Sequence, residues 1–238
     1  MANTSPLKTA GLNPHLNVWQ TSTPFDDFYV YSSGSGVWTT SPSGSAALIT
    51  GSDWLRLTSN GADNNPVGIR TNQQAFYFQA GRGQYGEAYV HAVNQATNNE
   101  NIAFGFASNT TLGITDGSSP TTSMTSALIL KLDGEDYFRA FSSNASTNTS
   151  TLSQTLAPDG FYLLRVDVFN FDSLNAGVSF SVNGYPLKDS NGLSIIHKVA
   201  YASAANMYGI VQTQGGSANA QNLDVDYACF GKNRVVSF

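Results

Sequence analysis

GFYLLRVDVFN (residues 160–170) and AGVSFSVNGYPLKD (residues 176–189) carry the clearest strand pattern in this chain. In each segment apolar and polar side chains alternate with a period of two, which is typical of a strand with one buried face. Asn183-Gly184 ends the second strand and is a strong two-residue hairpin signal, because both residues tolerate positive φ. We therefore expect two strands and a tight turn, with a core face made of Tyr162, Leu164, Val166, Val168, Val178, Phe180 and Val182.

The composition favours a single β domain with a largely uncharged surface. Hydrophobic residues form 41% of the 238-residue chain and charged residues only 11%, well below the usual share of about a quarter. Asn, Ser and Thr supply 22, 28 and 21 residues, a mixture that suits turns and strands better than helices. The net charge of −5 and the lack of basic runs argue against nucleic acid and anionic membranes as partners.

The lone cysteine and the first residues bear on the cellular compartment. Cys229 cannot form an internal disulfide, and its alternating context predicts a buried, unreactive thiol. The first residues lack a charged region followed by an apolar one, and no apolar run approaches the roughly 18 residues of a membrane helix. The sequence therefore predicts no signal peptide, no transmembrane helix and synthesis in a host cytoplasm.

Short apolar segments separated by turn-forming residues extend over most of the chain. The expected strands are residues 54–59, 75–80, 86–93, 101–107, 127–133, 136–142, 160–170, 177–184, 207–213 and 223–231, with a Ser/Thr-rich loop after residue 142. So many short strands predict an all-β fold, an antiparallel two-sheet sandwich of the jelly-roll type. We expect one β-sandwich domain over residues 26–238 and an extended N-terminal arm over residues 1–25, which contains Pro6, Pro14 and Pro24.

The last expected strand, LDVDYACF, carries two aspartates two residues apart. Its alternation predicts that Leu223, Val225, Tyr227 and Cys229 point inward. Asp224 and Asp226 would then share the outward face, and a solvated or subunit-contacting role is expected for them.

The order of motifs after residue 127 resembles a known family. FYLLRVDV is followed by VSFSVNG and then by a late paired strand ending in DYACFGKNR. This order is similar to the concanavalin A-like lectin/glucanase sandwich, also called laminin-G-like, and more narrowly to members found as structural proteins of tailed-phage virions. The resemblance covers residues 54–234 and implies that the Asn183-Gly184 hairpin is structural.

Enzymes of this fold and of a related jelly roll carry motifs that this chain lacks. Glycoside hydrolases of this fold use an E-x-D-x-E strand, which does not occur here. YFQAGRGQ (residues 77–84) is similar to an alginate lyase string, but its decisive lysine is Gln79 and the partner strands are missing. Asp133, Glu135 and Asp136 surround Gly134 and predict a hairpin turn. We expect no enzymatic activity and no catalytic residues.

Metal and cofactor sites are not expected either. His15, His91 and His197 lie far apart and lack ligand-type neighbours at two or four residues. The dense Asp, Asn and His cluster of legume-type lectins and the H-x-N-P-R string of galectins are also missing.

The resemblance and the composition together predict a capsid decoration or cement protein on the head of a tailed phage. Such a protein would bind the major capsid protein and itself, as a homo-oligomer and by analogy a trimer, on the virion surface. The expected interface residues lie at the two ends of the chain: Leu7, Leu12, Leu16, Val18, Val235, Val236 and Phe238. The alternative is a carbohydrate-binding module of a phage fibre or adhesion protein, using Trp38, Trp54 or Tyr85.

Overall fold

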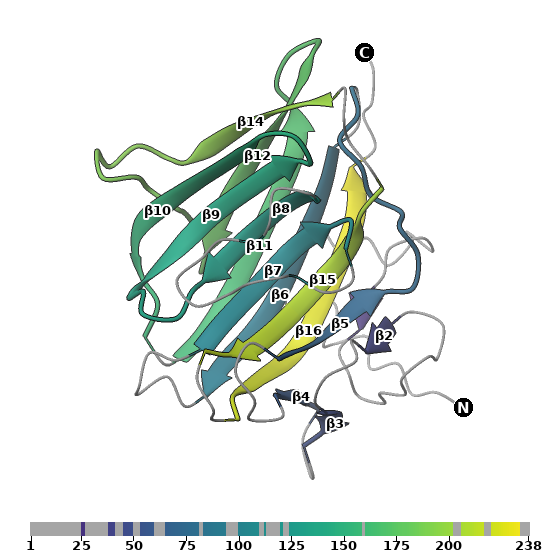
Figure 1. Cartoon of the computed structure of the whole chain (residues 1–238), viewed down its shortest axis with the longest axis vertical. Helices are drawn as coiled ribbons and strands as arrows, with labels where there is room; N and C mark the ends of the chain where they lie inside the picture. Colours follow the sequence, from purple (N-terminus) through teal and green to yellow (C-terminus); the bar gives the residue numbers. More distant parts are fainter. Residues whose placement is uncertain are drawn as a thin grey trace.

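The protein is a sandwich of two antiparallel β-sheets (Figure 1). The computed structural model describes residues 25–26, 38–40, 45–49, 53–59, 65–80, 83–93, 100–109, 112, 120, 124–158, 160–201, 206–216 and 220–233. These residues contain no α-helix, and no described helix is long and apolar enough to cross a membrane. The predicted all-β, two-sheet sandwich is therefore confirmed.

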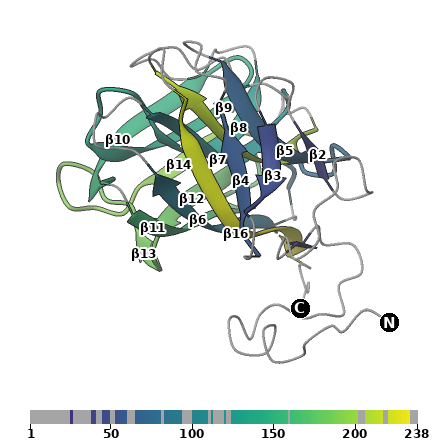
Figure 2. The same cartoon turned by 90° about the horizontal axis from the view of Figure 1, so that it is seen from below.

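The larger sheet has nine strands and the smaller sheet has seven. Across the larger sheet the order is β13 (Tyr185–Pro186), β12 (Asn175–Val182), β11 (Gly160–Asn170), β6 (Gly83–Val93), β16 (Asn222–Asn233), β4 (Leu55–Thr58) and β3 (Ser45–Leu48), while β1 (Phe25–Asp26) pairs with β16 and β14 (Ile196–Ala200) with β12. Across the smaller sheet the order is β10 (Asn148–Leu156), β9 (Tyr137–Asn144), β8 (Thr125–Lys131), β7 (Glu100–Ala107), β15 (Tyr208–Gly215), β5 (Pro66–Thr71) and β2 (Trp38–Thr40). Figure 2 shows the two sheets as stacked layers.

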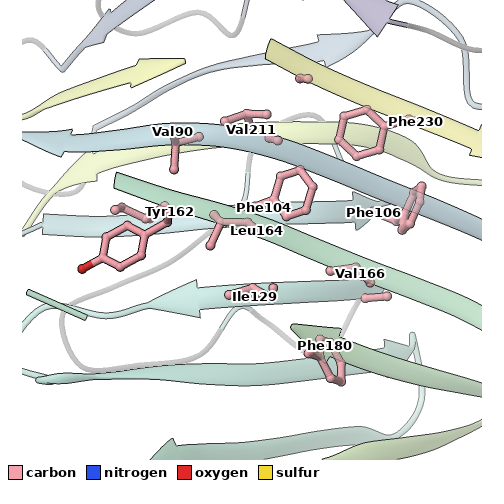
Figure 3. Close-up of a cluster of buried hydrophobic side chains, with 14 of the residues drawn as sticks. Val90, Phe104, Phe106, Ile129, Tyr162, Leu164, Val166, Phe180, Val211 and Phe230 are labelled. Atoms are coloured by element: carbon pink, nitrogen blue, oxygen red, sulfur yellow. The ribbon is translucent and has the colours of Figure 1, made fainter. Parts of the chain in front are cut away.

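The core fills the space between the sheets, and Phe230 of β16 belongs to it (Figure 3). Its ring is 5.5 Å from those of Phe104 and Phe106, measured between centroids. Gly86 in the larger sheet and Gly209 in the smaller sheet lie against this ring, because a Cβ on either would come within 2.6 Å of it. Two glycines therefore make room for one large side chain, which matches the dense packing of protein interiors.

The segments with the clearest alternation form β11 and β12, as expected. All seven residues predicted for their core face are buried. Asn183 and Gly184 have φ angles of 53° and 81°, and Val182 pairs with Tyr185 across the turn. The Asn183 side chain also accepts a hydrogen bond from the Leu163 amide at 2.8 Å, so this turn anchors the end of β12 to β11.

Two predicted elements are wrong. Residues 75–80 form no strand; the segment holds only an isolated bridge from Phe76 to Met207, and both of these side chains are buried. The predicted Ser/Thr-rich loop after residue 142 instead contains β10, which pairs with β9 in register from Asn148 to Leu152. Its strand pattern is hidden in the sequence because its inward side chains are hydroxyls rather than aliphatic groups.

A β-bulge in β16 also overturns the predicted alternation. The register against β6 shifts between Val225 and Tyr227. Leu223 and Val225 point into the core as expected, but Ala228 and Phe230 then take the inward positions. Tyr227 and Cys229 therefore lie on the opposite face, as Asp224 does.

Candidate functional site

The outer surface of the larger sheet, which we call the sheet face, carries several aromatic and charged side chains that the core excludes. They come from β4, β6, β11 and β16, which are neighbours in the sheet. Because alternate residues of these strands fill the core, the remaining ones must project from the sheet face. This placement brings together residues up to 168 positions apart in the sequence.

Four rings form a cluster on the sheet face that we call the aromatic platform: Trp54, Tyr89, His91 and Phe161. The His91 and Phe161 rings are stacked, with centroids 4.1 Å apart and planes within 10°. Trp54 lies 5.9 Å from Phe161 and 5.8 Å from Tyr89. Phe161 is 52% exposed, so the platform offers ring surface to solvent.

An ion pair supports one side of the aromatic platform. Arg56 donates to both carboxylate oxygens of Asp224, at 2.6 and 2.8 Å. His91 Nδ1 is 3.8 Å from the same carboxylate. The hydrogen bonds to Asp224 raise the pKa of Arg56. Asp224 is only 4% exposed, which contradicts a solvated position for it, whereas the alternative of a subunit contact stays a prediction.

A second network lies on the same face around Arg165. Its guanidinium donates to both oxygens of Asp167 at 2.8 Å and to Glu87 Oε2 at 3.1 Å. The Tyr227 hydroxyl donates to the other Glu87 oxygen at 2.9 Å. Hydrogen bonding to Asp167 outweighs the effect of burial and raises the pKa of Arg165, so this side chain remains charged throughout the physiological range.

Cys229 lies beside the Arg165 network. Its Sγ is 4.0 Å from the Tyr85 hydroxyl, and the residue is 1% exposed. Burial raises the pKa of this thiol to about 11, and burial likewise raises the pKa of Tyr85. The predicted buried thiol is therefore present, although it faces away from the core between the sheets.

The carboxylates of the sheet face take part in ion pairs. Glu87, Asp167 and Asp224 each bind an arginine. A retaining glycosidase needs one carboxylic acid that can donate a proton and one carboxylate that can attack. On the sheet face all three carboxylates instead accept hydrogen bonds from arginine side chains. What the face offers chemically is exposed ring surface beside fixed hydrogen-bonding groups.

Exposed apolar side chains are frequent along strands β9 to β14, a region that we call the apolar side. Of nine exposed large hydrophobic residues among those described, eight come from β9 to β14: Tyr137, Leu152, Leu156, Phe171, Leu174, Tyr185, Leu193 and Ile196. Strand β10 ends one sheet there and β13 and β14 end the other, and these strands lie together in Figures 1 and 2. A hydrogen bond of 2.9 Å from the Gln154 amide to the Lys188 carbonyl joins the two edges.

The structure separates the residues that the sequence proposed for binding. The interface residues Leu7, Leu12, Leu16, Val18, Val235, Val236 and Phe238 lie outside the described residues, as does all of the predicted arm before Phe25. Trp38 is buried in the core at 1% exposure, so its predicted use in sugar binding is wrong. Trp54 belongs to the aromatic platform, and Tyr85 lies near Arg165, whose Cζ is 5.4 Å from its ring centroid.

Sequence reasoning missed the aromatic platform because its members come from two strands, β6 and β11, and from the residue that precedes β4. Tyr89, His91 and Phe161 were visible only as outward residues of their strands. The register in which Phe161 lies opposite His91 is a property of the sheet. Among the described residues no cluster of three or more His, Cys, Asp or Glu side chains is arranged to hold a metal ion.

Comparison with known proteins shows similarity of fold. No known family profile and no curated protein sequence matches the chain. Among solved structures, the carbohydrate recognition domain of Emp47p aligns with a TM-score of 0.56 at 13% identity, over 88% of this chain and 94% of that one. A protein of unknown function from Shewanella oneidensis MR-1 aligns with a TM-score of 0.57 at 17% identity, over 100% and 97% of the two chains.

An endo-1,3-beta-glucanase from Streptomyces sioyaensis aligns with a TM-score of 0.52 at 16% identity, over 87% of this chain and 94% of the enzyme. At such low identities these alignments establish the fold alone. The chain therefore has the concanavalin A-like sandwich fold shared by lectins and glucanases, as the motif order implied.

Proposed function

We propose that this chain is a non-enzymatic structural protein of a tailed-phage virion, a decoration or cement protein on the capsid surface. It would bridge neighbouring major capsid proteins after synthesis in the host cytoplasm, and would do so as a homo-oligomer. Each subunit would add buried contact area to the shell. The observation that carries this proposal is the apolar side.

The apolar side has the character of a protein-binding surface. Tyr185, Leu174 and Leu193 are 77%, 73% and 66% exposed, and all three lie in or beside turns at the sandwich edge. Scattered exposed hydrophobic residues are normal, but a gathering of them on one side marks an interaction site. The low charge of the chain lets such a surface be covered without burying unpaired ions.

The ion pairs of the sheet face support a role without catalysis. The carboxylates of Asp224 and Glu87 on the sheet face are bound to Arg56 and Arg165. Separating either carboxylate from its arginine for proton transfer would break these hydrogen bonds. Incubation with β-glucans and alginate should therefore release neither reducing ends nor an unsaturated product.

Capsids that lack the protein test the proposal directly. Purified chain is added to them, and cryo-electron microscopy should show saturable density at fixed lattice positions. Leu174→Ser should weaken this binding at least tenfold, whereas Phe161→Ser, an equally apolar change on the sheet face, should leave it unaltered. Sedimentation of the free chain reports whether it is an oligomer. Absence of ordered density, or equal effects of the two variants, would refute the proposal.

The aromatic platform favours a second candidate, reversible binding of glycans. Pyranose rings stack on exposed aromatic faces, and fixed polar groups beside them give orientation. A glycan array should then show binding without turnover, and Phe161→Ala should abolish it while Leu174→Ser does not. An array on which no glycan is bound, or glycan binding that Phe161→Ala leaves unchanged, would exclude glycan binding by the aromatic platform.

A further inference from the structure

His197 links the two sheets at the apolar side. It lies on β14, opposite Val178 of β12, and turns inward so that only 3% of it is exposed. Its Nδ1 is 2.9 Å from Ser142 Oγ on β9, and its Nε2 is 3.0 Å from Thr151 Oγ1 on β10. One imidazole therefore connects an edge strand of the larger sheet to two strands of the smaller sheet.

The surroundings of His197 suit a neutral ring. Ser142, Thr151 and Phe180 face it, the last at 5.0 Å between centroids, and none of them carries a charge. Lys198, the next residue on β14, points the other way and pairs with Asp172 at 2.8 Å. A neutral imidazole has one donor and one acceptor, and a hydroxyl can serve either. A protonated ring would bring a charge into this site without an ionised partner among these neighbours.

Few other polar contacts hold the segment 187–200 against the smaller sheet. The Gln154 amide donates to Lys188 O at 2.9 Å, and Gln154 Nε2 donates to Ser190 O at 3.3 Å. We propose that His197 is an acid-sensitive latch: protonation of its ring releases β14 and the preceding hairpin from β9 and β10. That segment presents Leu193 and Ile196, so the latch controls the shape of part of the apolar side.

The direction of the pH response follows from the burial of the ring. Burial lowers the pKa of His197 from 6.5 to about 4. When the segment opens, the imidazole returns to water and regains its ordinary pKa, so the open state binds a proton that the closed state excludes. The closed state therefore loses stability as pH falls below about 6.5, and the loss is complete below about 4. Between pH 7 and pH 5 the opening equilibrium should rise about 20-fold.

Amide hydrogen exchange of the full chain measures this opening. Rates at pH 7 and pH 5 are first corrected for the intrinsic pH dependence of exchange. The protection of β14 amides should then fall about 20-fold between these pH values. His197→Gln, which keeps a donor and an acceptor but does not titrate, should show no such fall. His91→Gln on the sheet face serves as the matched control and should retain the wild-type response.

Direct titration of the His197 ring by NMR provides the second measurement and needs no variant. An imidazole pKa above 6 in the folded chain would overturn the inference, and so would an equal pH response in His197→Gln. The titration of Asp172 does not overlap the pH range of this measurement, because hydrogen bonds from Lys198 and Asn175 lower the pKa of Asp172 well below its usual value. The latch deepens the proposed function, yet both measurements use the isolated chain, so a failure of capsid binding would leave them unaffected.

Discussion

Replacing Gly209 by alanine should destabilise the fold through a single steric conflict. The new Cβ would lie 2.4 Å from Cγ of Phe230 and 2.6 Å from both Cδ atoms. Cγ sits close to the backbone of β16, so a rotation of the ring cannot move it far. On its other side the ring already meets Gly86, where a Cβ would be 2.6 Å away. The Phe230 ring therefore has little space into which it can move away from residue 209.

Overpacking of a dense core lowers the free energy of unfolding by about 1–3 kcal/mol. Because the Phe230 ring cannot move away, we expect the cost of Gly209→Ala to lie near the upper end of this range, at about 3 kcal/mol. The lower entropy of the unfolded alanine chain offsets about 0.5–1 kcal/mol of this. We expect a net loss of about 2 kcal/mol in the free energy of unfolding. Urea denaturation followed by tryptophan fluorescence measures it, with an unchanged slope showing that the folded state stays compact.

A double-mutant cycle with Phe230→Ala identifies the cause, because alanine lacks the Cγ and Cδ atoms that the new Cβ would meet. The smaller side chain leaves a cavity beside residue 209, which the alanine methyl group would partly fill. The double variant should therefore be more stable than the sum of the single effects predicts, by about 1 kcal/mol or more. Gly177→Ala is the control, because its Cβ meets only the outer end of the half-buried Phe169 ring, which can swing away. Additive effects, or an equal cost at Gly177, would refute the steric explanation.

Three further predictions concern the sheet face and the β12 turn. Arg165→Met should cost about 2–3 kcal/mol at neutral pH in urea denaturation, because Glu87, only 6% exposed, loses its charged partner; an unchanged midpoint would show that the pair is dispensable. Asn183→Ala should cost about 1–2 kcal/mol and Asn183→Gly less, because both variants lose the acceptor for the Leu163 amide but only Ala disfavours a φ of 53°; equal thermal midpoints of the two variants would contradict this. The Cys229 thiol, with its pKa raised to about 11, should not react with a thiol reagent at pH 8 until urea unfolds the chain, and rapid labelling of the folded protein would disprove its burial.

The local sequence pattern predicts part of this fold. β11 and β12 alternate aliphatic and polar residues, and such strands have one stable placement, with the aliphatic face against another sheet. Asn183-Gly184 adds a turn whose positive φ angles few other residue pairs accept. The same logic failed for β10, because its inward Thr151 contacts a histidine from another sheet rather than an aliphatic core. It failed again for residues 75–80, where Phe76 is buried without strand pairing beyond one bridge.

The sequence by itself determined the all-β class, the sandwich and the uncharged surface, because these follow from composition and from period-two alternation. Only the tertiary structure decided the rest. The bulge after Val225 moved Tyr227 and Cys229 to the sheet face. Strand register placed Phe161 on His91, and Arg165 beside Glu87 78 residues away. Such contacts depend on which strands are neighbours and on how they are offset, and that choice minimises the free energy of the whole core rather than of any one segment.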